Sequence, residues 1–172
     1  MALSAERQTK KTKAGPRDAA NEASAAIPFE RGLPVGLLRA REAVMVHMRP
    51  ILRAHGTTEQ QWRILRALNE THPIDKTTLT NHAALLMPSL LRILKDLKKA
   101  GLIRLVRSPA NARLTGVVLT SRGAEYASVV SAALAKKSRV LKQVIGEATV
   151  DQLLDLLRTV EIRLATIERE QQ

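Results

Sequence analysis

Residues 85–123, LLMPSLLRILKDLKKAGLIRLVRSPANARLTGVVLTSRG, decide the fold of this 172-residue chain. Apolar residues at helical spacing predict a helix over 88–100, with a proline tolerated in its first turn and Gly101 at its end. Runs rich in valine and leucine predict strands at 102–107 and 115–120, separated by a cluster of turn-forming residues. The segment therefore predicts a helix followed by a β-hairpin with a wide basic tip.

Two more helices are expected just before this segment. Either of two adjacent residues, Thr57 or Thr58, has capping-box spacing to a glutamine and begins a helix that ends before His72. A short helix follows over 76–84, with Asp75 as its N-cap. Helix, helix, turn, helix and β-hairpin in this order predict a winged helix-turn-helix. The expected fold class is mainly α with a small β-hairpin wing.

The chain divides into three predicted regions. Residues 1–32 lack an apolar period and predict a disordered basic tail, either simply solvated or an arm on the DNA backbone. Residues 57–121 form the winged helix-turn-helix, and residues 33–56 and 122–172 form a helical dimerisation region. The last helix, which begins at Thr149, carries an apolar stripe with heptad spacing that needs a long partner. That partner is either the first helix of the same chain or a second subunit, and we expect a homodimer.

The helix over 88–100 has the surface of a DNA-recognition helix. One side carries Leu90, Leu94 and Leu97, and the other side carries Ser89, Arg92, Asp96 and Lys99, flanked by Pro88 and Lys95. Small and basic side chains of this kind suit the major groove, where arginine bonds guanine with both of its donors. Residues 88–122 contain eight basic residues and one acid, a net charge of +7 against +12 for the whole chain. Charge of one sign indicates a polyanionic partner, double-stranded DNA.

The composition excludes several other classes of function. The chain has no cysteine, which excludes disulfides, thiolate zinc sites and iron–sulfur clusters and fits a reducing cytoplasm. An aromatic content of 2% argues against recognition of single strands by base stacking. No secretory signal and no run of 18 apolar residues is present. Catalytic motifs, cofactor motifs and metal-ligand spacings are also missing, so we expect no enzyme, no cofactor and no metal.

At this level of detail the sequence resembles a known family. The run LRAHGTTEQQWRILRAL (52–68), together with the segment 85–123, resembles the MarR family of bacterial transcriptional regulators. The run LLRAREAVMVHMRPILRAHG (37–56) is similar to the HpaR-like subgroup of homoprotocatechuate operons. The resemblance covers about residues 36–145. It implies an obligate dimer on an inverted-repeat operator, usually a repressor that a small ligand releases.

The resemblance also implies DNA contacts in the wing. The family's wing usually carries an Asp-x-Arg motif, and this chain has Asn111-Ala112-Arg113. Arg113 would enter the minor groove, and Asn111 replaces the acid that usually braces this arginine. The expected DNA-binding residues are therefore Pro88, Ser89, Arg92, Lys95, Lys99, Arg107, Asn111 and Arg113.

One arginine lies where an apolar residue is expected. Arg41 falls within the apolar stripe of a helix predicted over 35–55, four residues after Leu37 and three before Val44. A buried guanidinium needs a partner, which is a protein carboxylate, a helix C-terminal carbonyl or the carboxylate of a ligand. In a MarR-type arrangement, the residues expected with Arg41 around an aromatic-sized pocket are Met45, His47, Met48, Trp62 and Met87, although each also suits a core position.

We therefore predict a cytoplasmic, homodimeric repressor of aromatic-catabolism genes. Its effector is expected to be a small aromatic carboxylate or the CoA thioester of one. The alternative is an architectural DNA-binding protein that shares the basic helix and wing but needs no effector. A helical protein of membrane surfaces is a third class, which the turn-and-wing layout disfavours.

Overall fold

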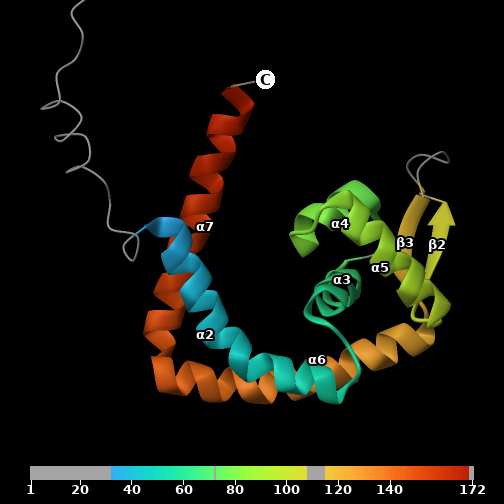
Figure 1. The fold of residues 1–172 in the computed structure, drawn as a ribbon, viewed down its shortest axis with the longest axis horizontal. Coiled ribbons are helices and arrows are strands. Elements are labelled where there is room, and N and C mark those ends of the chain that lie inside the picture. The colour runs from blue at the N-terminus through green and yellow to red at the C-terminus, as the bar shows by residue number, and fades with distance from the viewer. Residues whose placement is uncertain (1–31, 72, 108–114, 171–172) are drawn as a thin grey trace, which may run out of the picture. The chain divides into compact units, whose positions relative to one another are not determined.

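The computed structural model describes residues 32–71, 73–107 and 115–170 (Figure 1). The chain divides into two units, residues 1–42 and 43–172, and each is described by itself. The elements in chain order are α2 (Leu33–Ala54), α3 (Glu59–Glu70), β1 (Ile74–Asp75), α4 (Lys76–Ala83), α5 (Met87–Lys99), β2 (Ile103–Arg107), β3 (Thr115–Leu119), α6 (Ser121–Ile145) and α7 (Glu147–Glu170).

The wing belongs to a three-stranded antiparallel sheet with the strand order β1-β3-β2. Ile103 pairs with Leu119 in the predicted hairpin, which the structure confirms. The sequence predicts a short extended piece at Ile74-Asp75, and this piece forms the third strand, β1. Its pairing was not predicted: Ile74 pairs with Val117 across the other edge of β3. A strand of two residues is too short to show a period in the sequence, and its partner lies more than 40 residues away.

Two of the predicted helix starts are confirmed. The capping box uses Thr58: its hydroxyl accepts from the Gln61 N–H at 3.2 Å, and Gln61 Oε1 accepts from the Thr58 N–H at 3.0 Å. Asp75 caps α4 by accepting from the Thr78 N–H at 2.9 Å and the Thr78 hydroxyl at 2.6 Å. These hydrogen bonds hold the pKa of Asp75 below its ordinary value, because they stabilise the ionised carboxylate.

The predicted start of the last helix is wrong by two residues. We expected Thr149 to begin it, but α7 begins at Glu147. Gly146 alone makes the break, with φ of 95°. The Val150 N–H already donates to the Gly146 carbonyl at 3.1 Å, so the helical hydrogen bonds resume at once and no separate cap is needed.

The core joins the winged helix-turn-helix to the first half of α6. The predicted inner face of α5, Leu90, Leu94 and Leu97, is buried. The largest fully buried side chains come from α3, α4, α5, β3 and α6; they are Ile64, Leu65, Leu68, Leu79, Leu90, Val117 and Val130. One continuous core therefore holds α5, the sheet and the start of α6 together.

Tight backbone contacts fix the start of α6. The Thr120 N–H donates to the Leu102 carbonyl at 3.0 Å, and the Thr120 hydroxyl accepts from the Gly123 N–H at 3.0 Å. Gly123 approaches so closely that a Cβ atom there would stand 1.9 Å from the Leu102 carbonyl oxygen. One turn later, the Tyr126 hydroxyl donates to the His55 carbonyl at 2.7 Å. Movement of α6 near Gly123 is therefore coupled directly to the winged helix-turn-helix.

Candidate functional site

Helix α5 exposes a cationic face at the position predicted for DNA contact. Pro88, Arg92, Lys95 and Lys99 are all exposed. At 100° per residue, these four residues lie opposite the buried leucines of the same helix. The centre of the exposed face therefore carries three cations and a proline.

Two predicted outer residues lie to one side of that face. Ser89 is half-buried, and Ser89 and Asp96 line a groove of about 260 Å³ toward the start of α3. The other residues that line this groove are Thr58, Gln60, Gln61, Leu85, Arg92 and Ile93. The single acid of the region thus faces α3 rather than the centre of the cationic face.

The positive charge continues beyond α5. Seven cations of the region 88–122 lie among the described residues, all are exposed, and none forms an ion pair with another described residue; they are Arg92, Lys95, Lys98, Lys99, Arg104, Arg107 and Arg122. Uncompensated charge of one sign is what phosphate binding requires. The predicted wing residues Asn111 and Arg113 lie outside the described residues.

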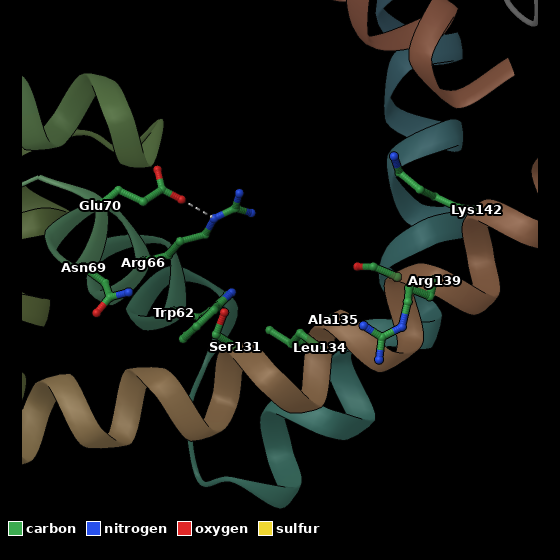
Figure 2. Close-up of a pocket in the computed structure, with 10 residues that line it drawn as sticks. Trp62, Arg66, Asn69, Glu70, Ser131, Leu134, Ala135, Arg139 and Lys142 are labelled. Atoms are coloured by element: carbon green, nitrogen blue, oxygen red, sulfur yellow. Dashed lines mark hydrogen bonds and ion pairs between the residues drawn. The ribbon is translucent and has the colours of Figure 1, made fainter. Parts of the chain in front are cut away.

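A second feature is a groove between α3 and α6, which we call the α3–α6 groove (Figure 2). Its volume is about 470 Å³. Helix α3 contributes Trp62, Arg66, Asn69 and Glu70, and α6 contributes Ser131, Leu134, Ala135, Ser138, Arg139 and Lys142. On both helices these residues recur at three- and four-residue steps, so each helix presents one stripe to the groove.

The groove combines an aromatic wall with a cationic rim. Trp62 is 9% exposed and packs in the core, which fixes its ring. Arg66 Nε donates to Glu70 Oε1 at 2.9 Å, and Figure 2 shows the Arg66 guanidinium reaching into the space on the α6 side. Arg139 and Lys142 line the groove from α6. Lys142 also pairs with Asp151 Oδ1 at 3.4 Å, so the rim carries three cations against two carboxylates and favours an anion by one net positive charge.

The residues that we predicted around a ligand lie on several elements of the chain. Of these, only Trp62 lines the α3–α6 groove. Met45 packs against the core, Met48 is half-buried and His47 is exposed. Met87 is the first residue of α5, at the recognition surface rather than beside Trp62 in the α3–α6 groove.

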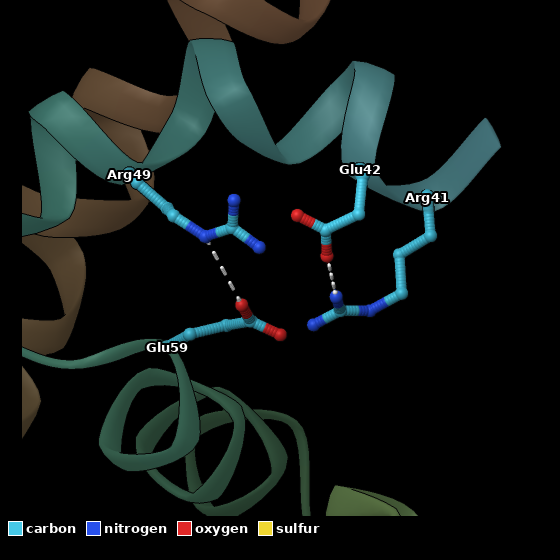
Figure 3. Close-up of polar contacts among 4 residues, drawn as sticks. All are labelled: Arg41, Glu42, Arg49 and Glu59. Carbon is cyan, nitrogen blue, oxygen red and sulfur yellow. Dashed lines mark hydrogen bonds and ion pairs between the residues drawn. The ribbon is translucent and has the colours of Figure 1, made fainter. Parts of the chain in front are cut away.

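Arg41 belongs to the unit of residues 1–42 and is exposed. Its Nη1 lies 2.5 Å from Glu42 Oε1, so it has the protein carboxylate that was one of its predicted partners (Figure 3). In the other unit, Arg49 pairs with Glu59 at 3.7 Å. The role of Arg41 as the anchor of a ligand carboxylate stays a prediction.

Metal binding and membrane insertion find no support in the described residues. No three histidine, aspartate or glutamate side chains of residues 32–71, 73–107 and 115–170 gather in a way that could hold a metal ion. Within the same ranges, no helix is both apolar enough and long enough to cross a bilayer.

Comparison with known proteins now identifies the family. A sequence model of the MarR family matches residues 55–114. The HTH-type transcriptional regulator FarR of Neisseria gonorrhoeae is 37% identical over 123 residues, which are 72% of this chain and 84% of FarR. The chain belongs to the MarR family. It is a DNA-binding transcription regulator, and this family is not one of enzymes.

Two further relatives are similar over most of their length. The homoprotocatechuate degradative operon repressor of Escherichia coli is 33% identical over 129 residues, 75% of this chain and 85% of the repressor. The crystal structure of NadR in complex with 4-hydroxyphenylacetate matches with a TM-score of 0.71 and 33% identity, covering 78% of this chain and 96% of NadR. The winged helix-turn-helix fold and the family resemblance are thus confirmed.

Sequence reasoning missed most of the α3–α6 groove. Trp62 was recognised, but Arg66, four residues later on the same helix, has Glu70 four residues further on and so looks like an ordinary surface ion pair. Nothing in α6 marks its lining residues, because Ser131, Leu134 and Ser138 suit any half-exposed helix. The spacing of Trp62 to Arg66 was the one signal available.

Proposed function

We propose that this MarR protein is a homodimeric repressor of genes for the catabolism of aromatic compounds. An aromatic acid, or the CoA thioester of one, binds in the α3–α6 groove and releases the DNA. Two relatives support this proposal by their names: one represses a homoprotocatechuate operon and the other is a complex with 4-hydroxyphenylacetate. Because the target is chromosomal DNA, the activity belongs to the cytoplasm.

The observation that carries the proposal is the pairing of Trp62 with Arg66 on one face of α3. A fixed indole ring gives a flat apolar surface for an aromatic ring. A guanidinium one turn away offers two parallel donors to a carboxylate. A volume of about 470 Å³ accommodates a small aromatic acid with room to spare.

The cations of α6 would affect binding of the free acid and of its CoA thioester differently. Arg139 and Lys142 lie on the opposite side of the groove from Arg66. A free acid needs only Arg66, whereas the phosphates of a CoA thioester would use the cations of α6. Measuring binding of the free acid and of its CoA thioester separates the two forms.

The position of the groove provides a route from ligand to DNA. Helix α3 packs on α4 and α5 in the core, and α6 continues away from the DNA-binding lobe toward α7. A ligand that contacts both helices changes the free energy of any movement between them. It therefore favours one spacing of the two recognition helices of a dimer over another.

The dimer itself rests on exposed apolar surface. Large apolar side chains of α7 and of the end of α6 are about half exposed or more; they are Val140, Val144, Ile145, Leu153, Leu154, Leu156, Ile162, Leu164 and Ile167. A stable monomer rarely leaves so much apolar surface in water. A second copy would cover it and would place two recognition helices on half-sites about 10 bp apart on an inverted repeat.

Replacement of Arg66 tests the effector site. In wild-type protein, 4-hydroxyphenylacetate at about 100 times its Kd is expected to raise the Tm by about 5–10 °C. Arg66→Met should weaken binding by about tenfold to a hundredfold, because a charge-assisted hydrogen bond is lost while the volume is kept. Differential scanning fluorimetry with this acid, related benzoates and their CoA thioesters measures both effects.

Two matched variants give the controls. Glu70→Gln breaks the same ion pair but leaves Arg66 in place, so it should bind the acid at least as tightly as wild type. Arg41→Met tests the anchor predicted from the sequence. Loss of binding in Arg41→Met, with retention in Arg66→Met, would move the anchor to α2. If no compound of either type shifts the Tm, the architectural DNA-binding protein becomes the better description.

A further inference from the structure

The recognition helix begins at an exposed leucine. Leu86 is 77% exposed, the largest value for any leucine among the described residues. It directly precedes Met87, the first residue of α5, and its carbonyl accepts the first helical hydrogen bond, from the Leu90 N–H at 3.0 Å. Its side chain therefore projects at the N-terminal end of α5.

Leu86 occupies a position where a polar side chain is the rule. The N-cap prefers serine, threonine, aspartate or asparagine, whose oxygen accepts from a free N–H of the first turn. Helices α3, α4 and α6 follow this rule with Thr58, Asp75 and Thr120. Helix α5 has no side-chain hydrogen bond at its cap. A leucine here loses the cap and exposes apolar surface, and local rules broken in this way point to function.

The surroundings of Leu86 limit what can cover it. The exposed face of the same helix carries Pro88 and then the cations Arg92, Lys95 and Lys99. A second copy of this chain would bring like charges together at this surface. Double-stranded DNA is complementary to the cations, and in its major groove the exposed apolar group is the C5-methyl of thymine.

We propose that Leu86 reads thymine, by packing against C5-methyl groups in the major groove at the N-terminal end of α5. Arg92, Lys95 and Lys99 hold the helix in the groove through phosphates and guanine, and Leu86 adds discrimination at a neighbouring A·T pair. The inference rests on the DNA binding of the MarR family and is independent of the effector proposal.

Deoxyuridine tests this contact, because it differs from thymidine only in lacking the methyl group. Wild-type protein first selects a binding site from a random pool of duplex DNA. Each thymine of the selected half-site is then replaced by deoxyuridine, and Kd is measured by fluorescence anisotropy. We expect one or two positions at which the substitution weakens binding by about threefold to fivefold for each lost methyl contact.

The variant Leu86→Ser removes the apolar side chain and supplies a good N-cap. It should keep or raise the Tm, bind the selected DNA, and show the same Kd with thymine and deoxyuridine. Leu86→Ala is the second variant, in case the new serine makes its own contact with DNA. Leu91→Ser is the matched control, because Leu91 is also exposed, at 46%, but lies more than a turn from the N-terminal end.

Three results would overturn the inference. The first is a wild-type protein that is indifferent to deoxyuridine at every position. The second is a methyl dependence that persists in both Leu86 variants. The third is a dependence that is lost in Leu91→Ser and kept in Leu86→Ser, which would assign the contact to Leu91.

Discussion

Gly123→Ala is expected to lower the free energy of unfolding by about 3 kcal/mol or more, which corresponds to a fall in Tm of about 6–12 °C. The added Cβ would stand 1.9 Å from the backbone carbonyl oxygen of Leu102. That oxygen also accepts from the Thr120 N–H, so a shift of Leu102 or of α6 that made room for the Cβ would disturb this hydrogen bond. Thermal unfolding followed by circular dichroism measures the effect.

The direction of the change in Tm shows whether packing or helix propensity dominates at a glycine. Alanine is favoured over glycine within a helix by about 1 kcal/mol, so an open site would give a more stable protein. Gly36 in α2 is such a site, because a Cβ there would meet nothing within 4 Å beyond its chain neighbours and the nearby backbone of its own helix. Gly36→Ala should therefore keep or raise the Tm. A Gly123→Ala protein that melts like wild type would show that α6 does not approach Leu102 as closely as the structure has it.

DNA binding is expected to depend steeply on salt. Each phosphate contact contributes about 0.9 to the slope of log K against log salt concentration, and a dimer presents the cationic face twice. Lys95→Gln and Lys99→Gln should each make the slope about 2 units shallower, one unit for each subunit. Anisotropy titrations between 50 and 300 mM KCl measure the slope.

Lys136→Gln is the matched control, because Lys136 is an exposed lysine of α6 outside the cationic region 88–122. Its slope should equal that of wild type. A wild-type slope shallower than about −2 would contradict phosphate binding by this face.

The sequence predicts those features that depend on residues close together in the chain. The cap at Thr58, the leucine face of α5 and the hairpin of β2 and β3 each depend on spacings of a few residues. The pairing of β1 with β3 and the close approach at Gly123 depend on residues far apart in the chain or on backbone packing, and neither leaves a local pattern. The sequence therefore predicts the helices and the hairpin, but not the contacts by which distant elements pack on one another.

The cationic face could be predicted from the sequence better than the α3–α6 groove, because its residues lie close together in the chain. The cationic face lies on one helix and its adjoining strand, so charge counting along the sequence found it. The α3–α6 groove joins helices whose residues are about 70 positions apart, and only Trp62 was in the predicted set. Arg41 was predicted as a buried cation and is exposed, and its role at a ligand stays a prediction; Arg66 is exposed at the rim of the groove.

The central claim is that a ligand in the α3–α6 groove weakens DNA binding. The most direct measurement is the Kd for the selected duplex, with and without an aromatic acid or CoA thioester at a concentration that saturates the Tm shift. We expect the ligand to weaken DNA binding by about 5- to 150-fold in wild-type protein, and we expect Arg66→Met to need about tenfold to a hundredfold more ligand for the same effect. An unchanged Kd for ligand-saturated wild-type protein would contradict the claim.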